Sequence, residues 1–164
     1  MAKQSAPTKE QTVVHNTFVI ERSYSKPPQK VFAAFADEAK KRRWYGESDN
    51  HTIEEYTSDF RVGGSERFRY RFNERTPFPG VELSSDGSYQ DIIQDQRIVT
   101  ASTMSIGGKR ISSTLVTIEL LPTDNGTDLI CTHQGAFYEG ADGPEMREGG
   151  WKKLFDRLDQ ELAR

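Results

Sequence analysis

The sequence has little of what marks membrane, secreted or nucleic-acid-binding proteins. No apolar run approaches the roughly 20 residues that a membrane-spanning helix needs, and hydrophobic residues make up only 34% of the 164 residues. Residues 1–12 are polar and lack the apolar segment of a secretory signal, so we expect a disordered tail there. With 22 basic and 25 acidic residues the net charge is −3, which argues against nucleic acid as a partner. These absences favour a soluble globular protein with no membrane partner.

Cysteine and histidine are also scarce, which limits the chemistry. The single cysteine, Cys131, cannot form an intrachain disulfide, so we expect a reducing, cytoplasmic setting. Only Cys131 and His133 share one strand face at a ligand-like spacing, and a closed zinc site needs four ligands. We therefore expect no metal and interpret Cys131 as a core residue. His133, a lone polar group on an apolar wall, can contact a ligand or act as a general base.

Motifs for cofactors and nucleophilic catalysis are absent too. The chain has no phosphate-binding Gly-Lys-Ser/Thr loop, no Gly-x-Gly-x-x-Gly fingerprint and no Gly-x-Ser-x-Gly elbow. We expect no cofactor, and no residue is assigned as catalytic.

Residues 143–163 predict a long amphipathic helix that organises the rest of the chain. Pro144 suits the first helical position, and apolar or small residues recur every four positions, widened by two aromatics. These residues are Met146, Gly150, Trp151, Leu154, Phe155, Leu158 and Leu162. Gly149 and Gly150 each cost about 1 kcal/mol relative to Ala inside a helix. The pair therefore suggests a close backbone approach to a strand or an enclosed space.

The segment before residue 47 predicts one strand and two short helices. Residues 13–24 are typical of a strand, and residues 27–36 of a helix that the prolines begin. Asp37 is a plausible N-cap for a second helix that ends at Gly46. The basic run 40–43 is interpreted as the solvated face of that helix.

From residue 52 the period changes to two, which predicts strands joined by hairpins. The predicted strands are 52–61, 65–73, 81–94, 97–106, 109–121 and 127–136. A three-residue loop at 62–64 would place Asp59 opposite Arg67 and Glu55 opposite Arg71, with the arginines facing solvent. The Gly107-Gly108 pair predicts a two-residue turn, and a further turn is expected at 122–126 with positive φ at Asn125-Gly126.

This order predicts a single α+β domain over residues 13–164. Consecutive hairpins give an antiparallel sheet, which twists and curls, and the C-terminal helix is the only element long enough to cover the concave face. Long antiparallel edges also permit a homodimer.

Three stretches resemble a known family. ERSYSKPPQKVFAAFADEAKKRRWYG (21–46) is similar to the start of SRPBCC, or START-like, domains, in the branch related to the C-terminal domain of the activator of heat-shock protein 90 ATPase. DFRVGGSERFRY (59–70) resembles the Gly-Gly hairpin of that branch, and REGGWKKLFDRLDQEL (147–162) resembles its closing helix. The resemblance implies a helix-grip fold, in which a curved antiparallel sheet wraps around a long helix with a cavity between them.

Family members bind hydrophobic or aromatic ligands, so the resemblance implies a small-molecule-binding protein with a cavity under the helix. A cyclase or hydrolase that uses a pocket His or Tyr is one alternative. The other is a protein-interaction module with a chaperone as candidate partner. The residues that we expect to line the pocket are Trp44, Phe68, Tyr70, Phe72, Tyr89, Met104, His133, Phe137, Met146, Gly150 and Trp151. The neighbouring Tyr138 is a further candidate.

Overall fold

The computed structural model describes residues 12–164, so the predicted tail lies almost wholly outside the described residues. The strands are β1 (Val14–Tyr24), β2 (His51–Ser58), β3 (Ser65–Phe72), β4 (Glu82–Ile93), β5 (Arg97–Ile106), β6 (Lys109–Thr123) and β7 (Gly126–Phe137). The helices are α1 (Pro28–Ala36), α2 (Glu38–Lys41), the π-helical turn η1 (Arg42–Gly46) and α3 (Pro144–Leu162). The order and type of the elements are as predicted.

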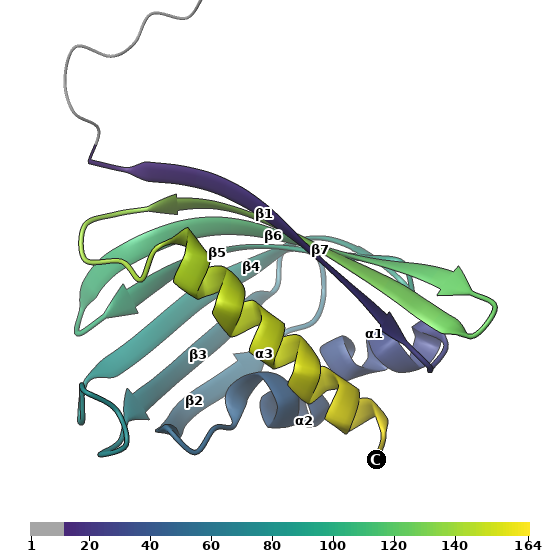
Figure 1. The fold of residues 1–164 in the computed structure, drawn as a ribbon, viewed down its shortest axis with the longest axis horizontal. Coiled ribbons are helices and arrows are strands. Elements are labelled where there is room, and N and C mark those ends of the chain that lie inside the picture. Colours follow the sequence, from purple (N-terminus) through teal and green to yellow (C-terminus); the bar gives the residue numbers. More distant parts are fainter. Residues whose placement is uncertain (1–11) are drawn as a thin grey trace, which may run out of the picture.

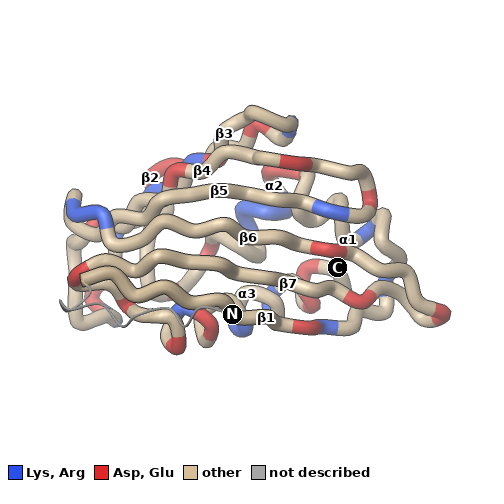
Figure 2. The backbone as a smooth tube through the Cα atoms, turned by 90° about the horizontal axis from the view of Figure 1, so that it is seen from above, with Lys and Arg blue, Asp and Glu red and all other residues tan. Residues whose placement is uncertain are grey.

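The seven strands form one antiparallel sheet in the order β1-β7-β6-β5-β4-β3-β2. Figure 2 looks onto this sheet, where the strands lie side by side. The sheet curves, and α3 crosses its concave face (Figure 1). This arrangement confirms the predicted α+β helix-grip fold. In residues 12–164 no helix combines the length and apolar character needed to cross a membrane.

Several local predictions are confirmed by the backbone. The Asp37 side chain accepts a hydrogen bond from the Lys40 amide, as expected of an N-cap. Gly107 and Gly108 form the two-residue turn between β5 and β6 with φ of +57° and +81°. The next turn is shorter than predicted, because β6 and β7 stay paired as far as Thr123 and Gly126. The positive φ predicted for the Asn125-Gly126 pair is found at Gly126 but not at Asn125.

The predicted register of the β2–β3 hairpin is wrong. The expected opposite pairs were Asp59–Arg67 and Glu55–Arg71. Glu55 instead lies opposite Arg69, because β2 ends at Ser58 and the connection to β3 spans residues 59–64, which moves the pairing by two residues. A bulge between Ile53 and Glu55 shifts the pairing by one more residue only beyond Glu55. Asp59 lies beyond the end of β2, where it pairs with Arg61 at 2.8 Å. The arginines of β3 still face solvent and acidic neighbours, including Glu55 at 3.1 Å from Arg69.

Two of the basic residues at 40–43 are not a solvated face, contrary to prediction. Lys41 is 8% exposed, and its Nζ lies 2.5 Å from Glu66 Oε2, which also accepts from Tyr56 at 2.7 Å and Tyr89 at 3.2 Å. A buried ammonium needs such a partner because removal from water penalises the charge. Arg43 likewise pairs with Glu161 of α3 at 2.6 Å.

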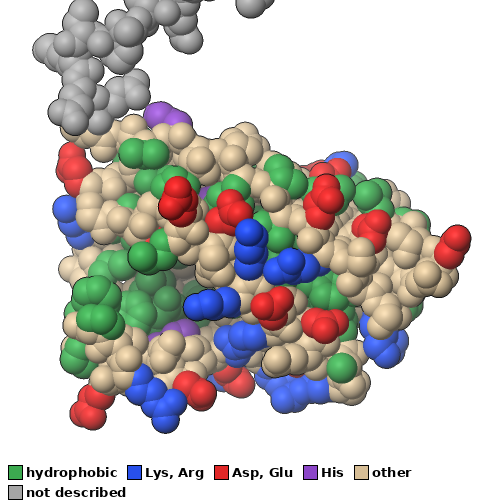
Figure 3. Space-filling view, in the orientation of Figure 1, with side chains coloured by type: hydrophobic (Ala, Val, Ile, Leu, Met, Phe, Trp, Pro, Cys, Tyr) green, Lys and Arg blue, Asp and Glu red, His purple; other side chains and the backbone are tan. Residues whose placement is uncertain are grey.

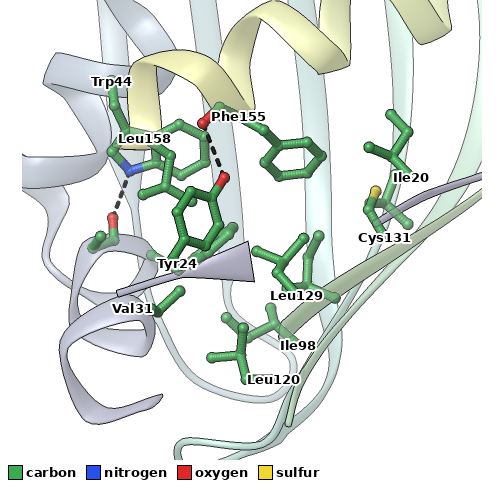
Figure 4. Packing of buried hydrophobic residues seen from close by; sticks show 14 of the residues in the cluster. Ile20, Tyr24, Val31, Trp44, Ile98, Leu120, Leu129, Cys131, Phe155 and Leu158 are labelled. Carbon is green, nitrogen blue, oxygen red and sulfur yellow. Dashed lines mark hydrogen bonds between the residues drawn. The ribbon is translucent and has the colours of Figure 1, made fainter. Parts of the chain in front are cut away.

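The main hydrophobic core lies under the C-terminal half of α3 (Figure 4). Phe155 and Leu158 are fully buried there, against Leu129 and Cys131 of β7. The Tyr24 hydroxyl donates to the Phe155 carbonyl at 2.9 Å, which ties β1 to the helix. Burial raises the pKa of Cys131 to about 12, so the thiol stays protonated, and its interpretation as a core residue is confirmed.

The glycine pair of α3 does not bring the backbone of the helix close to a strand, which was one of the two predicted roles of the pair. Apart from the adjacent backbone of the helix itself, a Cβ placed on Gly149 or Gly150 would meet no heavy atom of residues 12–164 within 4 Å. The helix makes most of its tertiary contacts with η1, β1 and α1, and its first half stands away from the middle of the sheet. That separation leaves the space described next.

Candidate ligand-binding cavity

A cavity of about 420 Å³ lies between the concave face of the sheet and α3. Its walls come from η1, strands β2–β7 and the inner face of the helix. Figure 3 shows a hollow with a largely hydrophobic wall, bordered by Lys and Arg side chains. The volume falls within the range of roughly 300–1,000 Å³ found for small-molecule sites.

Eight of the predicted pocket residues line this cavity. They are Phe68, Tyr70, Phe72, Met104, His133, Met146, Gly150 and Trp151. The aromatic side chains of β3 stand on the concave face because alternate residues of a strand point to the same side. The strict period-two pattern of β3 in the sequence is therefore what allowed these residues to be predicted as cavity-facing.

The other candidates lie elsewhere. Trp44 is buried behind the cavity, where its indole N–H donates to the Ala34 carbonyl at 2.8 Å. Tyr89 is 1% exposed and belongs to the network around Glu66. Phe137 is buried under the Arg147 guanidinium, 5.0 Å from the ring centre, and the Tyr138 hydroxyl is hydrogen-bonded to Ser113 at 2.7 Å.

His133 sits in the cavity wall between two aromatic rings. It stacks on Phe18 at 4.4 Å and on Phe137 at 6.2 Å between ring centres. Gly135 lies between the two side chains on β7, and a Cβ there would be 2.9 Å from the Phe137 ring and 3.1 Å from the His133 ring. The stack therefore requires glycine at this position.

The protonation state of His133 follows from its surroundings. Burial, assisted by the positive charge of Arg147, lowers the pKa of His133 to about 4. The imidazole is 1% exposed, and its Nδ1 is buried without a hydrogen-bond partner in the described part of the chain. It is thus a neutral polar group with unused hydrogen-bonding capacity in an apolar wall.

His51, which was not among the pocket residues predicted from the sequence, also lines the cavity. Its ring stacks on Tyr70 at 3.8 Å, and its Nε2 lies 2.6 Å from the Gly46 carbonyl. That carbonyl can only accept, so Nε2 carries the proton and Nδ1 is left as an acceptor. Burial lowers the pKa of His51, which keeps the ring neutral.

Arg147 and Asp142 form a fixed ion pair in the cavity wall. The guanidinium donates through two nitrogens to the two carboxylate oxygens, each at 2.8 Å, and also to the Ser112 hydroxyl at 3.1 Å. Bidentate pairs of this kind are the strongest and most directional of side-chain hydrogen bonds. Arg147 is only 8% exposed, so the pair is a structural part of the wall.

Sequence reasoning missed most of the polar lining. Apart from His51, the cavity residues not predicted include Tyr45, Asp142, Arg147, Lys153 and Arg157. Burial raises the pKa of Tyr45, and that of Tyr70 to about 12, so both phenols are neutral donors. Residues 12–164 contain no group of three or more His, Cys, Asp or Glu arranged to hold a metal ion.

The profile of the family described as activator of Hsp90 ATPase homolog 1-like protein matches residues 25–163. The chain belongs to this family. It is a branch of the SRPBCC superfamily, so the family indicated by the three sequence stretches is confirmed.

Solved structures show the same fold. A crystal structure from Rhizobium loti is 43% identical, with 92% of this chain and 99% of that chain covered and a TM-score of 0.81. An uncharacterized protein from Rhizobium leguminosarum is 32% identical over 93% and 97% of the two chains, with a TM-score of 0.86. An AHSA1-like protein from Aeromonas hydrophila, solved by NMR, shares 16% identity and the fold, with a TM-score of 0.67 over 90% and 92%. No curated protein matches at a significant level.

Proposed function

We propose that this protein binds a small apolar or aromatic molecule in the cavity beneath α3. The observation that carries the proposal is the cavity itself, about 420 Å³ in volume, with the aromatic side chains of Tyr45, Phe68, Tyr70, Phe72 and Trp151 in its wall. Membership of the family indicates a module that binds a ligand or a partner, and a hollow of this size with apolar walls favours a ligand.

The walls support binding without a large rearrangement. Phe68 and Tyr70 are fixed on β3, which is paired on both sides by β2 and β4. Trp151 projects from α3, where its ring lies 6.0 Å from that of Tyr45. Rigid aromatic walls of this kind lose little conformational entropy when a ligand enters, and neutral groups such as His133 and His51 can orient it.

The catalytic alternative has less support. A general base in a hydrolase or cyclase is held in position by a hydrogen-bonded partner and has a pKa near the working pH. Within residues 12–164 neither His133 nor His51 hydrogen-bonds to a carboxylate, and the pKa of His133 is about 4. Both rings are better suited to contact a ligand than to move a proton at neutral pH.

The first experiment is native mass spectrometry of protein purified from its own host without denaturation. We expect an extra mass of a few hundred daltons, typical of a drug-sized ligand, that is lost on denaturation. A bare mass would count against tight binding. In that case an environment-sensitive dye tests whether the cavity accepts any apolar molecule.

A matched pair of variants ties binding to this cavity. Gly150 lines the cavity and Gly149 does not, yet a Cβ on either would meet nothing within 4 Å. Gly150→Leu should therefore obstruct the cavity and weaken binding, whereas Gly149→Leu should leave binding unchanged. Equal binding by both variants would place the ligand elsewhere and overturn the proposal.

A further inference from the structure

Positive side chains outnumber negative ones in the wall of the cavity. Three cations line it, Arg147, Lys153 and Arg157, against one carboxylate, Asp142. The whole chain carries a net charge of −3, so the cavity is a local positive region on a negative protein. Low-dielectric walls strengthen the field of such a cluster.

The excess positive charge is concentrated at one end. Arg147 is neutralised by its two hydrogen bonds to Asp142. Lys153 and Arg157 have no carboxylate within ion-pair distance in the described part of the chain. Ten residues separate Arg147 from Arg157, which is about 15 Å along a helix. One end of the cavity is therefore balanced and the other is cationic.

The acidic residues near the cationic end are already paired. Glu47 and Asp49 are the carboxylates that act on Arg157. Glu47 lies 3.7 Å from Arg42, and Asp49 lies 3.9 Å from Arg75. Neither is a dedicated counter-charge for Lys153 or Arg157.

The two cations lie close together on α3, with Lys153 exposed and Arg157 half-buried. Lys153 and Arg157 are four residues apart on one helix, where like charges destabilise each other. Arg157 cannot simply turn away, because its Nη2 donates to the Arg43 carbonyl at 2.9 Å. Burial lowers the pKa of Arg157, because removal from water penalises the charged guanidinium, and Glu47 and Asp49 offset part of this effect. A bound anion would offset more of the effect.

We propose that the ligand is an anionic aromatic or apolar molecule, whose carboxylate or other acidic group is bound by Lys153 and Arg157 while its body lies against Phe68, Tyr70 and Trp151. This inference rests on the proposed function and adds the chemical class of the ligand. Arg supplies planar paired donors that match a carboxylate, and Lys adds a second charge. Ser48 and Asn50 also line the cavity and offer neutral hydrogen bonds.

The test compares two dyes that differ by one charge. Anilinonaphthalene sulfonate is anionic, and phenylnaphthylamine is the same molecule without the sulfonate; both fluoresce in apolar surroundings. Each is titrated into the full-length wild type and into Lys153→Gln/Arg157→Gln. The control, Lys30→Gln/Lys152→Gln, removes two exposed cations that do not line the cavity.

We expect the anionic dye to bind the wild type more tightly, and Lys153→Gln/Arg157→Gln to raise its dissociation constant about a hundredfold, since each of the two charged hydrogen bonds contributes a factor of about ten. The neutral dye should change less than about twofold in either double variant, since it makes no charged contact. Added salt should weaken only the anionic dye.

The outcomes separate the two proposals. If both dyes bind, are weakened by Gly150→Leu and are indifferent to Lys153→Gln/Arg157→Gln, cavity binding stands and the anionic class is overturned. If the control weakens the anionic dye as much, the effect is one of net charge and the assignment to these two residues is overturned. If neither dye binds the wild type, the proposed function fails and the inference fails with it.

Discussion

Replacing both glycines of α3 by alanine should stabilise the protein. A Gly pair inside a helix can serve the close approach of another backbone, where alanine would clash. Here a Cβ on Gly149 or Gly150 would meet no heavy atom within 4 Å. Only the helix propensity then changes, by about 0.8–1.0 kcal/mol for each Gly→Ala.

The two effects should add. Neighbouring residues of a helix do not face each other, and neither site has a tertiary partner to couple them. Gly149→Ala/Gly150→Ala should therefore raise the free energy of unfolding by about 2 kcal/mol. For a chain of this size each kcal/mol raises Tm by about 2–4 °C, so we expect a rise of roughly 4–8 °C.

Thermal unfolding followed by circular dichroism measures the shift, and urea unfolding gives the free energy directly. The single variants serve as controls, and each should supply about half of the gain. An unchanged or lower Tm for the double variant would refute the reasoning, because it would mean that the open space beside the pair is filled in solution. Alanine is small enough that dye binding should persist in the double variant.

Three further predictions follow from the wall and the core. Gly135→Ala should destabilise the protein by about 1–3 kcal/mol in urea unfolding, because its Cβ would overpack the His133–Phe137 stack; an unchanged stability would contradict the stacked geometry. Lys41→Met should cost about 3–5 kcal/mol by leaving Glu66 buried without its cation, whereas Lys40→Met should cost little, and equal effects would contradict the buried pair. The pKa of His133 falls from 6.5 to about 4 on folding. Between pH 6.5 and pH 4 the unfolded chain therefore binds a proton that the folded protein does not. The free energy of unfolding is accordingly highest above pH 6.5 and decreases as the pH falls towards 4. Between pH 7.5 and pH 5.0 the loss due to this residue should be about 2 kcal/mol, and it should disappear in His133→Gln; an identical pH dependence in that variant would refute the assignment.

The sequence was most informative where one face of an element is uniformly apolar. The alternation of Phe68, Tyr70 and Phe72 predicted both β3 and its contribution to the cavity. The four-residue spacing in α3 predicted the helix that covers the sheet. In each case the side-chain period is a property of the local backbone, so a short stretch suffices to detect it.

What the sequence could not show depends on contacts between distant segments. Lys41 looks like any member of a basic run until the fold brings Glu66 beside it. Lys153 and Arg157 lie off the apolar stripe of α3 and look solvent-exposed. They border the cavity because the first half of α3 stands away from the sheet. Residues on either side of the packed stripe of the helix therefore also face the open space. The hairpin register was missed because β2 ends at Ser58, before the predicted end of the strand at residue 61, which lengthens the connection to β3.

The position of β1 has a consequence for how the chain is made. Among the strands of residues 12–164 its one partner in the sheet is β7, and the register joins Val14 to Phe137 and Tyr24 to Thr127. At a synthesis rate of about 5–20 residues per second, β1 waits roughly 6–20 seconds after leaving the ribosome before its partner exists. During that time the meander from β2 to β6 can pair with itself, while Phe18 and Ile20 of β1 stay unburied. β7, the last strand to be translated, therefore completes the sheet by pairing with β1, and α3 can cover the cavity only after that.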